Sequence, residues 1–306
     1  MSRRHSSKIV VLAVFATAAS SMAPAFSDAQ VTDPTVRKAF ERADWRNLPT
    51  TQLKELVISS SLTYGLEPTP ESLRSNKDLY HHFAARVPLG ERVETAVAVS
   101  KKIEKGVGSA RSLEPLIHYD PAFAVVSSAA LNLAVLMPLR QNDELTGPRY
   151  VCQLMRSARS DESRGQMLAG LLLLGDQRVM PIVRECFGLL GPGGRKELAT
   201  SWSGFAYKSV VDFMLDWLDQ VVDRGDEFGS VAGALARLAI QAQPRAVLAV
   251  RRNFPAPATR GTPVDLLQKW DIRDYGQIIA PRLRALAKRE REPKVIPLVM
   301  DAWGIQ

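Results

Sequence analysis

Histidine and cysteine are both scarce in this chain, which has four of the former and two of the latter among 306 residues. Protein metal sites are built mainly from spaced His and Cys side chains, and no such set in this sequence suits zinc. The adjacent His81 and His82 point in different directions on a helix, so they cannot chelate one metal from a single face. We therefore expect no metal centre and no cofactor.

Recognised catalytic motifs are also missing. The chain has no Gly-x-Ser-x-Gly, the nucleophile elbow of lipases and esterases. Gly191-Pro192-Gly193-Gly194 resembles a phosphate loop, but it follows a helix and lacks the required Lys-Ser or Lys-Thr, so a helix stop and turn is the better interpretation. His118-Tyr119-Asp120 could form a base–acid cluster, but Asp120 before Pro121 is more typical of a helix N-cap. We expect no catalytic residue and a protein that is not an enzyme.

Signals for β-strands are nearly absent, since few stretches alternate apolar and polar residues between turn dipeptides. Residues typical of helix N-termini are frequent instead. Thr69-Pro70, Asp120-Pro121 and Thr262-Pro263 each place a capping side chain before a Pro at the first helical position. Beyond the N-terminus, the most apolar run is Leu168–Leu174, far short of the roughly 20 residues that span a bilayer. The sequence predicts an all-α fold with no membrane span in the mature chain.

The N-terminal segment has the layout of a secretory signal peptide. Arg3, Arg4 and Lys8 precede the apolar stretch Ile9–Ala19, and small residues allow cleavage after residue 25 or after residue 29. The alternative is an uncleaved membrane anchor, but the apolar stretch is shorter than a spanning helix. We expect residues 1–25 to be removed and the protein to be exported, to the periplasm or beyond the cell.

Basic side chains are in only mild excess. The net charge is +8, and removal of residues 1–25 deletes three basic and no acidic side chains, which leaves +5. This excess is no signature of nucleic-acid binding. The densest basic run, residues 282–294, is interrupted by Glu290 and Glu292 and is typical of a solvated helix face. The alternative is contact with an anionic partner, for which Arg282, Arg284 and Arg289 are the candidates.

One Pro-centred phrase recurs along the chain. Residues 113–117, 179–183 and 295–299 all read apolar, variable, Pro, apolar, apolar. Residues 168–187 also align without a gap with residues 235–254, and seven of the twenty positions are identical. A repeated unit of this kind cannot bury its apolar face alone and must stack on its neighbours. We expect two-helix units whose second helices begin near Leu113, Pro148, Val179, Val210, Ala246 and Val295.

The stretch Leu168–Val183 carries the closest likeness to a known family. It combines an apolar Ala/Leu helix, a Gly-Asp turn and a second helix that starts Arg-Val-x-Pro. In these features the chain resembles the HEAT-repeat family, and most closely its short bacterial form, related to the repeats of phycobilin lyases. The resemblance implies an α-solenoid of stacked helix pairs and brings no catalytic residue with it.

The repeat divides the chain into regions. Residues 31–108 lack it and are expected to form an N-terminal helical cap, with helices near 34–43, 51–62, 70–86 and 91–105. Residues 109–254 are expected to form the HEAT-like repeats, residues 255–270 an inserted loop, and residues 271–306 a C-terminal HEAT-like helical pair. A terminal cap of this kind gives a stacked array a polar outer face.

Two further sets of residues are candidates for special roles. Cys152 and Cys186 lie in the second helices of adjacent units, and in an exported protein they could form one disulfide or remain two buried thiols. Trp202, Phe205 and Tyr207 are best interpreted as packing residues, but an exposed aromatic cluster would suit a partner-binding groove.

The leading functional hypothesis is an exported, non-enzymatic scaffold that binds another protein or an envelope macromolecule on an extended surface. The alternative is an enzyme or cofactor-handling protein on the same scaffold, by analogy with the lyases, and that analogy rests on the fold alone. A passive structural role is a third hypothesis, which the sequence does not separate from the first.

Overall fold

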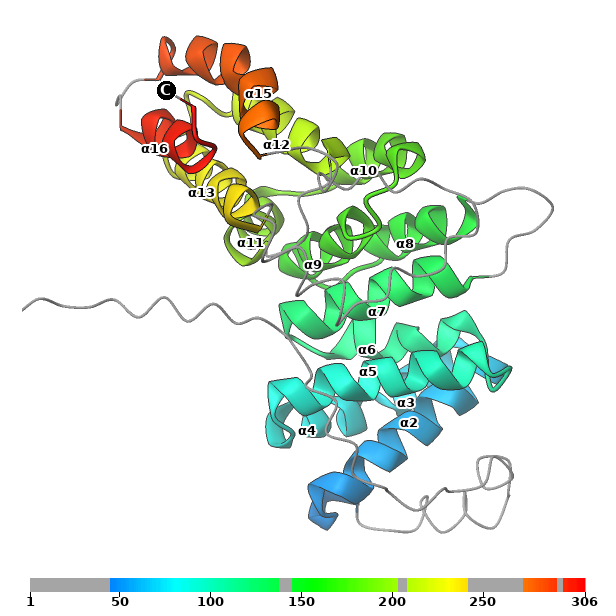
Figure 1. Cartoon of the computed structure of the whole chain (residues 1–306). Coiled ribbons are helices and arrows are strands. Elements are labelled where there is room, and N and C mark those ends of the chain that lie inside the picture. The colour runs from blue at the N-terminus through cyan, green and yellow to red at the C-terminus, as the bar shows by residue number, and fades with distance from the viewer. Residues whose placement is uncertain (1–44, 138–144, 203–207, 242–271, 291–293, 306) are drawn as a thin grey trace, which may run out of the picture.

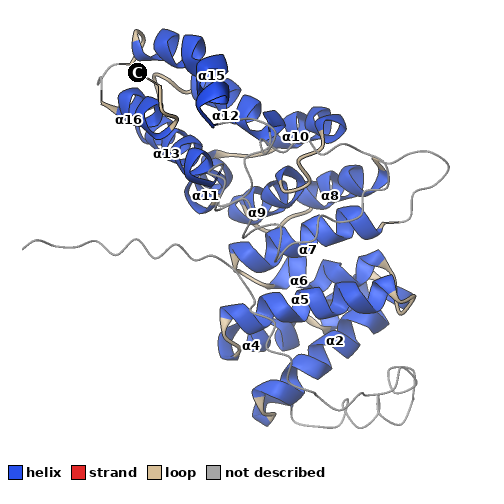
Figure 2. Cartoon of the chain, viewed as in Figure 1, coloured by secondary structure: helices blue, strands red, loops and turns tan. Residues whose placement is uncertain are grey.

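The protein is all-α in the part of the chain that the computed structural model describes, which comprises residues 45–137, 145–202, 208–241, 272–290 and 294–305 (Figures 1 and 2). The α-helices are α2 (Thr50–Leu66), α3 (Pro70–Ser75), α4 (Lys77–Arg86), α5 (Leu89–Glu104), α6 (Glu114–Tyr119), α7 (Phe123–Leu136), α8 (Thr146–Arg156), α9 (Asp161–Leu172), α10 (Met180–Phe187), α11 (Pro192–Ser201), α12 (Lys208–Gln220), α13 (Gly225–Gln241), α15 (Ile272–Ala287) and α16 (Val295–Ala302). Short 3-10 turns η2 (Trp45–Asn47), η3 (Ala110–Leu113) and η4 (Gln177–Val179) accompany them.

The helices form two rows. In the first row, α5, α7, α9, α11, α13 and α16 each pack on the next (Figure 1). The second row consists of α6, α8, α10, α12 and α15. Each of these helices packs on a first-row helix that lies beside it in the sequence, as α8 does on both α7 and α9. A single hydrophobic core runs between the rows from Leu53 in α2 to Ile305 after α16.

The predicted starts of the second helices agree with the structure at four positions. Helices α6, α8, α10 and α12 begin within two residues of Leu113, Pro148, Val179 and Val210. Ala246 and the predicted loop 255–270 lie outside the described residues. The Pro-centred phrase starts helices as expected, because Pro115 and Pro181 are the second residues of their helices and lack only an N–H that has no helical partner there.

The C-terminal pair departs from the expected order. Val295 does begin a helix, but α16 packs on α13 in the first row and not in the second. The indole Nε1 of Trp303 donates to the carbonyl oxygen of Leu235 in α13 at 3.1 Å. Helix α15 takes the second-row place beside α12, because Arg282 in α15 pairs with Asp216 in α12 at 2.8 Å. The expectation that Val295 starts a second helix was therefore wrong.

The described part of the region before the repeats is helical, with one clear difference from the sequence prediction. The expected helix 70–86 is divided at Asn76 into α3 and α4. Thr69 caps α3 as predicted, in a reciprocal capping box with Ser72. In the predicted repeats, Asp120 is not the N-cap of α7, which begins only at Phe123. Its Oδ1 accepts from the N–H of Ala122, the residue before α7, and from Arg92. The expected helix 34–43 and Thr262-Pro263 lie outside the described residues.

Successive first-row helices approach closely enough for their backbones to touch. Residues 165–172 of α9 are all buried. A Cβ atom added at Gly165 would collide with the carbonyl oxygen of Gly194 in α11. One added at Gly170 would lie 2.6 Å from the carbonyl oxygen of Ser127 in α7. Glycine is therefore required where α9 meets each of its two neighbours in the row.

None of the helices in the described part of the chain is both long enough and apolar enough to cross a membrane.

We predict that Gly165→Ala lowers the free energy of unfolding by about 1–3 kcal/mol, because the added methyl group forces α9 and α11 apart. The matched control is Gly229→Ala in α13, where an added Cβ would meet nothing within 4 Å. This control should raise stability by about 0.5–1 kcal/mol, since Ala favours the helix over Gly. Urea denaturation measures both, and equal effects of the two changes would contradict the prediction.

Candidate functional site

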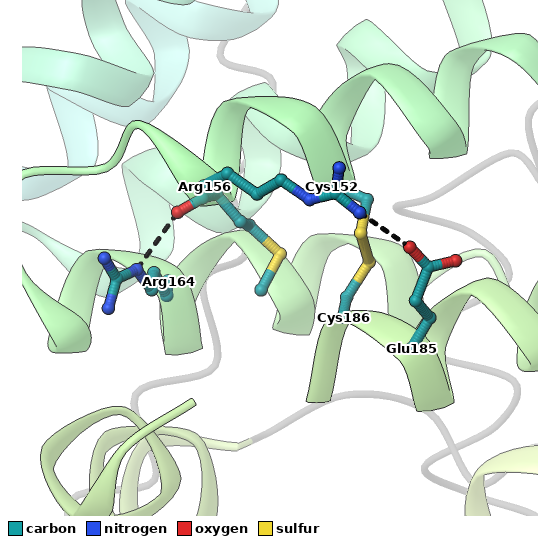
Figure 3. The surroundings of a disulfide bond; sticks show 6 residues. Cys152, Arg156, Arg164, Glu185 and Cys186 are labelled. Carbon is teal, nitrogen blue, oxygen red and sulfur yellow. Dashed lines mark hydrogen bonds and ion pairs between the residues drawn. A yellow bond between two sulfur atoms is a disulfide. The ribbon is translucent and has the colours of Figure 1, made fainter. Parts of the chain in front are cut away.

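Cys152 in α8 and Cys186 in α10 form a disulfide between two neighbouring second-row helices (Figure 3). Their Cα atoms are 5.7 Å apart and both residues are buried. Beside the bond, Arg156 in α8 pairs with Glu185 in α10 at 2.9 Å, and both side chains are well exposed (Figure 3). The sequence left open one disulfide or two buried thiols, and the structure has the disulfide.

We predict that replacing both cysteines by Ala lowers the free energy of unfolding by about 2–4 kcal/mol, because the bond no longer restricts the unfolded chain. Urea denaturation gives this value. Intact mass after alkylation in denaturant should show no label without reductant and two labels with it. Two labels on the exported protein without reductant would contradict the disulfide.

Arginines of the basic run form ion pairs with aspartates of the same protein. Arg282 in α15 pairs with Asp216, and Arg289, two residues after α15, pairs with Asp219 at 2.5 Å. Two of the three candidate partner contacts are therefore joined to α12. Asp216 also pairs with Arg184 in α10 at 2.7 Å. Arg284 is exposed.

The aspartates of α12 that pair with these arginines were not predicted, although their spacing in the sequence indicates a shared helix face. Asp212, Asp216 and Asp219 recur at helical spacing and thus share one face of α12. Tyr275 in α15 donates to Asp212 at 3.3 Å, which completes the seam between the two helices.

The aromatic candidates do not form an exposed groove in the described residues. Trp202, at the end of α11, is 2% exposed and belongs to the core, so its proposed contact with a partner is corrected to a packing role. The guanidinium of Arg237 in α13 donates to the carbonyl oxygen of Trp202 at 3.3 Å, which binds the end of α11 to the next first-row helix. Phe205 and Tyr207 lie outside the described residues.

Glu114, the first residue of α6, is the centre of a buried polar cluster that sequence reasoning did not find. Tyr64 in α2 and Tyr150 in α8 donate to its carboxylate at 2.5 Å and 2.7 Å. Arg111 in η3 donates to the same carboxylate at 2.5 Å. Burial and the hydrogen bond to Glu114 raise the pKa of both tyrosines well above the ordinary value. The Glu114 carboxylate is therefore occupied by donors from three elements and ties the N-terminal helices to the repeats.

His118 lies one turn after Glu114 and is partly buried. Burial is the main cause that lowers its pKa below the ordinary value, and the Arg159 guanidinium acts in the same direction, against the attraction of Glu114. The imidazole is therefore neutral at pH 7, since even the unperturbed pKa of His is about 6.5.

Asp120 and Arg92 form a second buried pair, with the guanidinium Nη1 donating to the carboxylate Oδ1 at 2.6 Å. The Asp120 side chain is 1% exposed and that of Arg92 is 11% exposed. Burial raises the pKa of Asp120, while the N–H of Ala122 and the Arg92 guanidinium partly offset this rise. The pair joins α5 to the start of α7 and completes the polar contacts between these units.

We predict that Arg92→Met lowers the free energy of unfolding at pH 7 by about 3 kcal/mol, because it leaves the Asp120 charge buried without a partner. Arg92→Met/Asp120→Asn should recover most of the loss, since no charge remains. The folded-state pKa of Asp120 is above the unfolded value, so folding takes up a proton in acid. The difference between the single and double variants should therefore shrink as the pH falls toward 4. A constant difference across urea denaturations at several pH values would contradict this.

The glycine-rich turn before α11 binds a carboxylate of the protein itself. The N–H groups of Gly191 and Gly194 donate to the Asp161 carboxylate of α9 at 2.8 Å and 2.6 Å. An acidic side chain thus occupies the place where a helix N-terminus would hold an anion. Within the described ranges, no group of three or more His, Cys, Asp or Glu side chains is arranged to hold a metal ion.

No protein-family model, no curated protein and no solved structure matches the chain.

Proposed function

We propose that this protein is an exported, non-enzymatic α-solenoid of HEAT-like helix pairs that binds another macromolecule on its extended surface. One observation carries the proposal: first-row helices α5, α7, α9, α11 and α13 pack in the order in which they occur in the chain. Each therefore contacts chiefly its neighbours in sequence, which is the contact pattern of a repeat array. Arrays of this kind present long continuous surfaces to a partner.

The disulfide supports the export part of the proposal. Disulfides form and persist in oxidising compartments such as the periplasm and the extracellular space. The Cys152–Cys186 bond joins adjacent units and is consistent with such a destination, which the N-terminal segment also favours.

The arrangement of the buried polar groups supports a binding role over catalysis. Catalysis needs a titratable group that can reach a substrate. The Glu114 carboxylate is buried beneath three donors, and the Asp120 carboxylate is buried against Arg92. Both carboxylates are used to join helices.

The test is photo-crosslinking in the exporting cell, with a crosslinkable residue placed in turn at exposed positions of three consecutive units. Suitable positions are Gln153 in α8, Glu185 in α10 and Gln220 in α12. We expect one and the same partner to crosslink from at least two of these units, because a solenoid binds along its length. The partner is then purified and its stoichiometric complex reconstituted.

The matched control places the crosslinker at the buried positions Leu154 and Leu215 of two of the same helices, which should give no partner adduct. Crosslinks from none of the three units, together with turnover of a small molecule by the purified protein, would contradict the proposal and favour the enzyme or cofactor-handling alternative.

A further inference from the structure

Tyr119 lies at the centre of a basic and aromatic cluster on the N-terminal half of the protein. We call it the Tyr119 cluster and define it as Arg74, His81, His118, Tyr119 and Arg159. The Arg159 guanidinium lies 4.2 Å above the Tyr119 ring, and the His81 ring meets that ring edge-on with centroids 5.8 Å apart. The His118 ring is 6.3 Å away. The members come from α3, α4, α6 and the segment before α9.

The phenol of Tyr119 holds this arrangement in place. Its hydroxyl donates to the carbonyl oxygen of Leu73 at 2.9 Å, so the ring is anchored from α6 onto α3. The ring face is then a fixed platform for the Arg159 guanidinium. The guanidinium also interacts with the Tyr119 hydroxyl, which partly offsets the rise that burial causes in the pKa of Tyr119. Because a guanidinium has five N–H donors, others are left for a further partner.

Arg159 differs from its neighbour Arg156 in its partners. Both side chains are exposed, Arg156 at the end of α8 and Arg159 in the segment before α9. Arg156 pairs with Glu185, whereas Arg159 pairs with no carboxylate in the described part of the chain. The guanidinium fork of Arg159 thus keeps its donors available for an external oxyanion.

The charge of the cluster selects the type of anion. Arg74 is already paired with Glu71 at 2.9 Å, and His118 is neutral at pH 7 because burial lowers its pKa. The nearby Glu114 is paired with Arg111. Arg159 is then the arginine of the cluster that has no carboxylate partner among the described residues, and a single guanidinium fits a singly charged, planar carboxylate better than a phosphate dianion.

We infer that the Tyr119 cluster binds a carboxylate side chain of an acidic segment of the partner protein, held by the exposed N–H groups of the Arg159 guanidinium, which itself covers the buried Tyr119 ring. This inference rests on the proposed function and names the chemistry of the partner at one place on its surface. His81 stands at the rim of the same ring, where its N–H can donate to the second oxygen of such a carboxylate.

The probe is a capped, fluorescent peptide with two aspartates separated by glycine, titrated into the mature protein and followed by anisotropy. We expect Arg159→Gln to weaken binding about tenfold, the loss of one charge-assisted pair. Arg159→Lys, which keeps the charge but loses the fork, should also weaken it. The matched control Arg156→Gln should bind as the original chain does. Circular dichroism and thermal melting verify that each variant is folded.

Three results would overturn the inference. They are equal binding by Arg159→Gln and the original chain, an equal loss of binding in Arg156→Gln, or displacement of the peptide by inorganic phosphate at a lower concentration than by acetate.

Capture of the crosslinked partner separates this inference from the proposed function. A partner retained equally by Arg159→Gln contradicts the inference and leaves the proposed function standing. Peptide binding that needs Arg159, in a protein that has no macromolecular partner, supports the site and contradicts the scaffold.

Discussion

Successive first-row helices approach until their backbones touch, and the rest of the structure depends on this close approach. Gly165 faces Gly194 of α11 on one side of α9, and Gly170 faces Ser127 of α7 on the other. At these two contacts no side chain lies between the backbones of the helices. Because successive first-row helices lie so close together, a second-row helix can cover only the outer side of the contact between them. Residues 165–172 of α9 are buried throughout, and the polar residue among them, Gln166, donates its amide N–H groups to the carbonyl oxygen of Pro121 and to Glu197.

Backbones packed this closely leave few places for polar groups, and the carboxylates of Glu114 and Asp161 are held by joining one element to another. Glu114 collects donors from α2, η3 and α8, and Asp161 accepts the N–H groups at the start of α11. A buried carboxylate without such partners would cost several kcal/mol. Joining helices is therefore the structural role of these two carboxylates.

Much of the local structure could be predicted because it depends on residues close in the sequence. A Pro in the first turn marks a helix start whatever lies around it, and the capping box at Thr69 is complete within four residues. The row in which a helix packs depends on distant residues. Arg282 and Asp216 are 66 positions apart, and no local pattern says that α15 takes the second row or that α16 joins the first. The Glu114 cluster escaped prediction for the same reason, since Tyr64 is 50 residues away.

The arginines show why composition alone could not locate a binding surface. The basic run 282–294 drew attention in the sequence, yet Arg282 and Arg289 neutralise aspartates of α12. Arg159 lies outside that run and stacks on an aromatic ring, a contact that offsets little of its charge. The capacity of a cation to bind a partner depends on what already pairs with it. The surface best suited to an anion is therefore the one where the fold supplies a platform and no counter-charge.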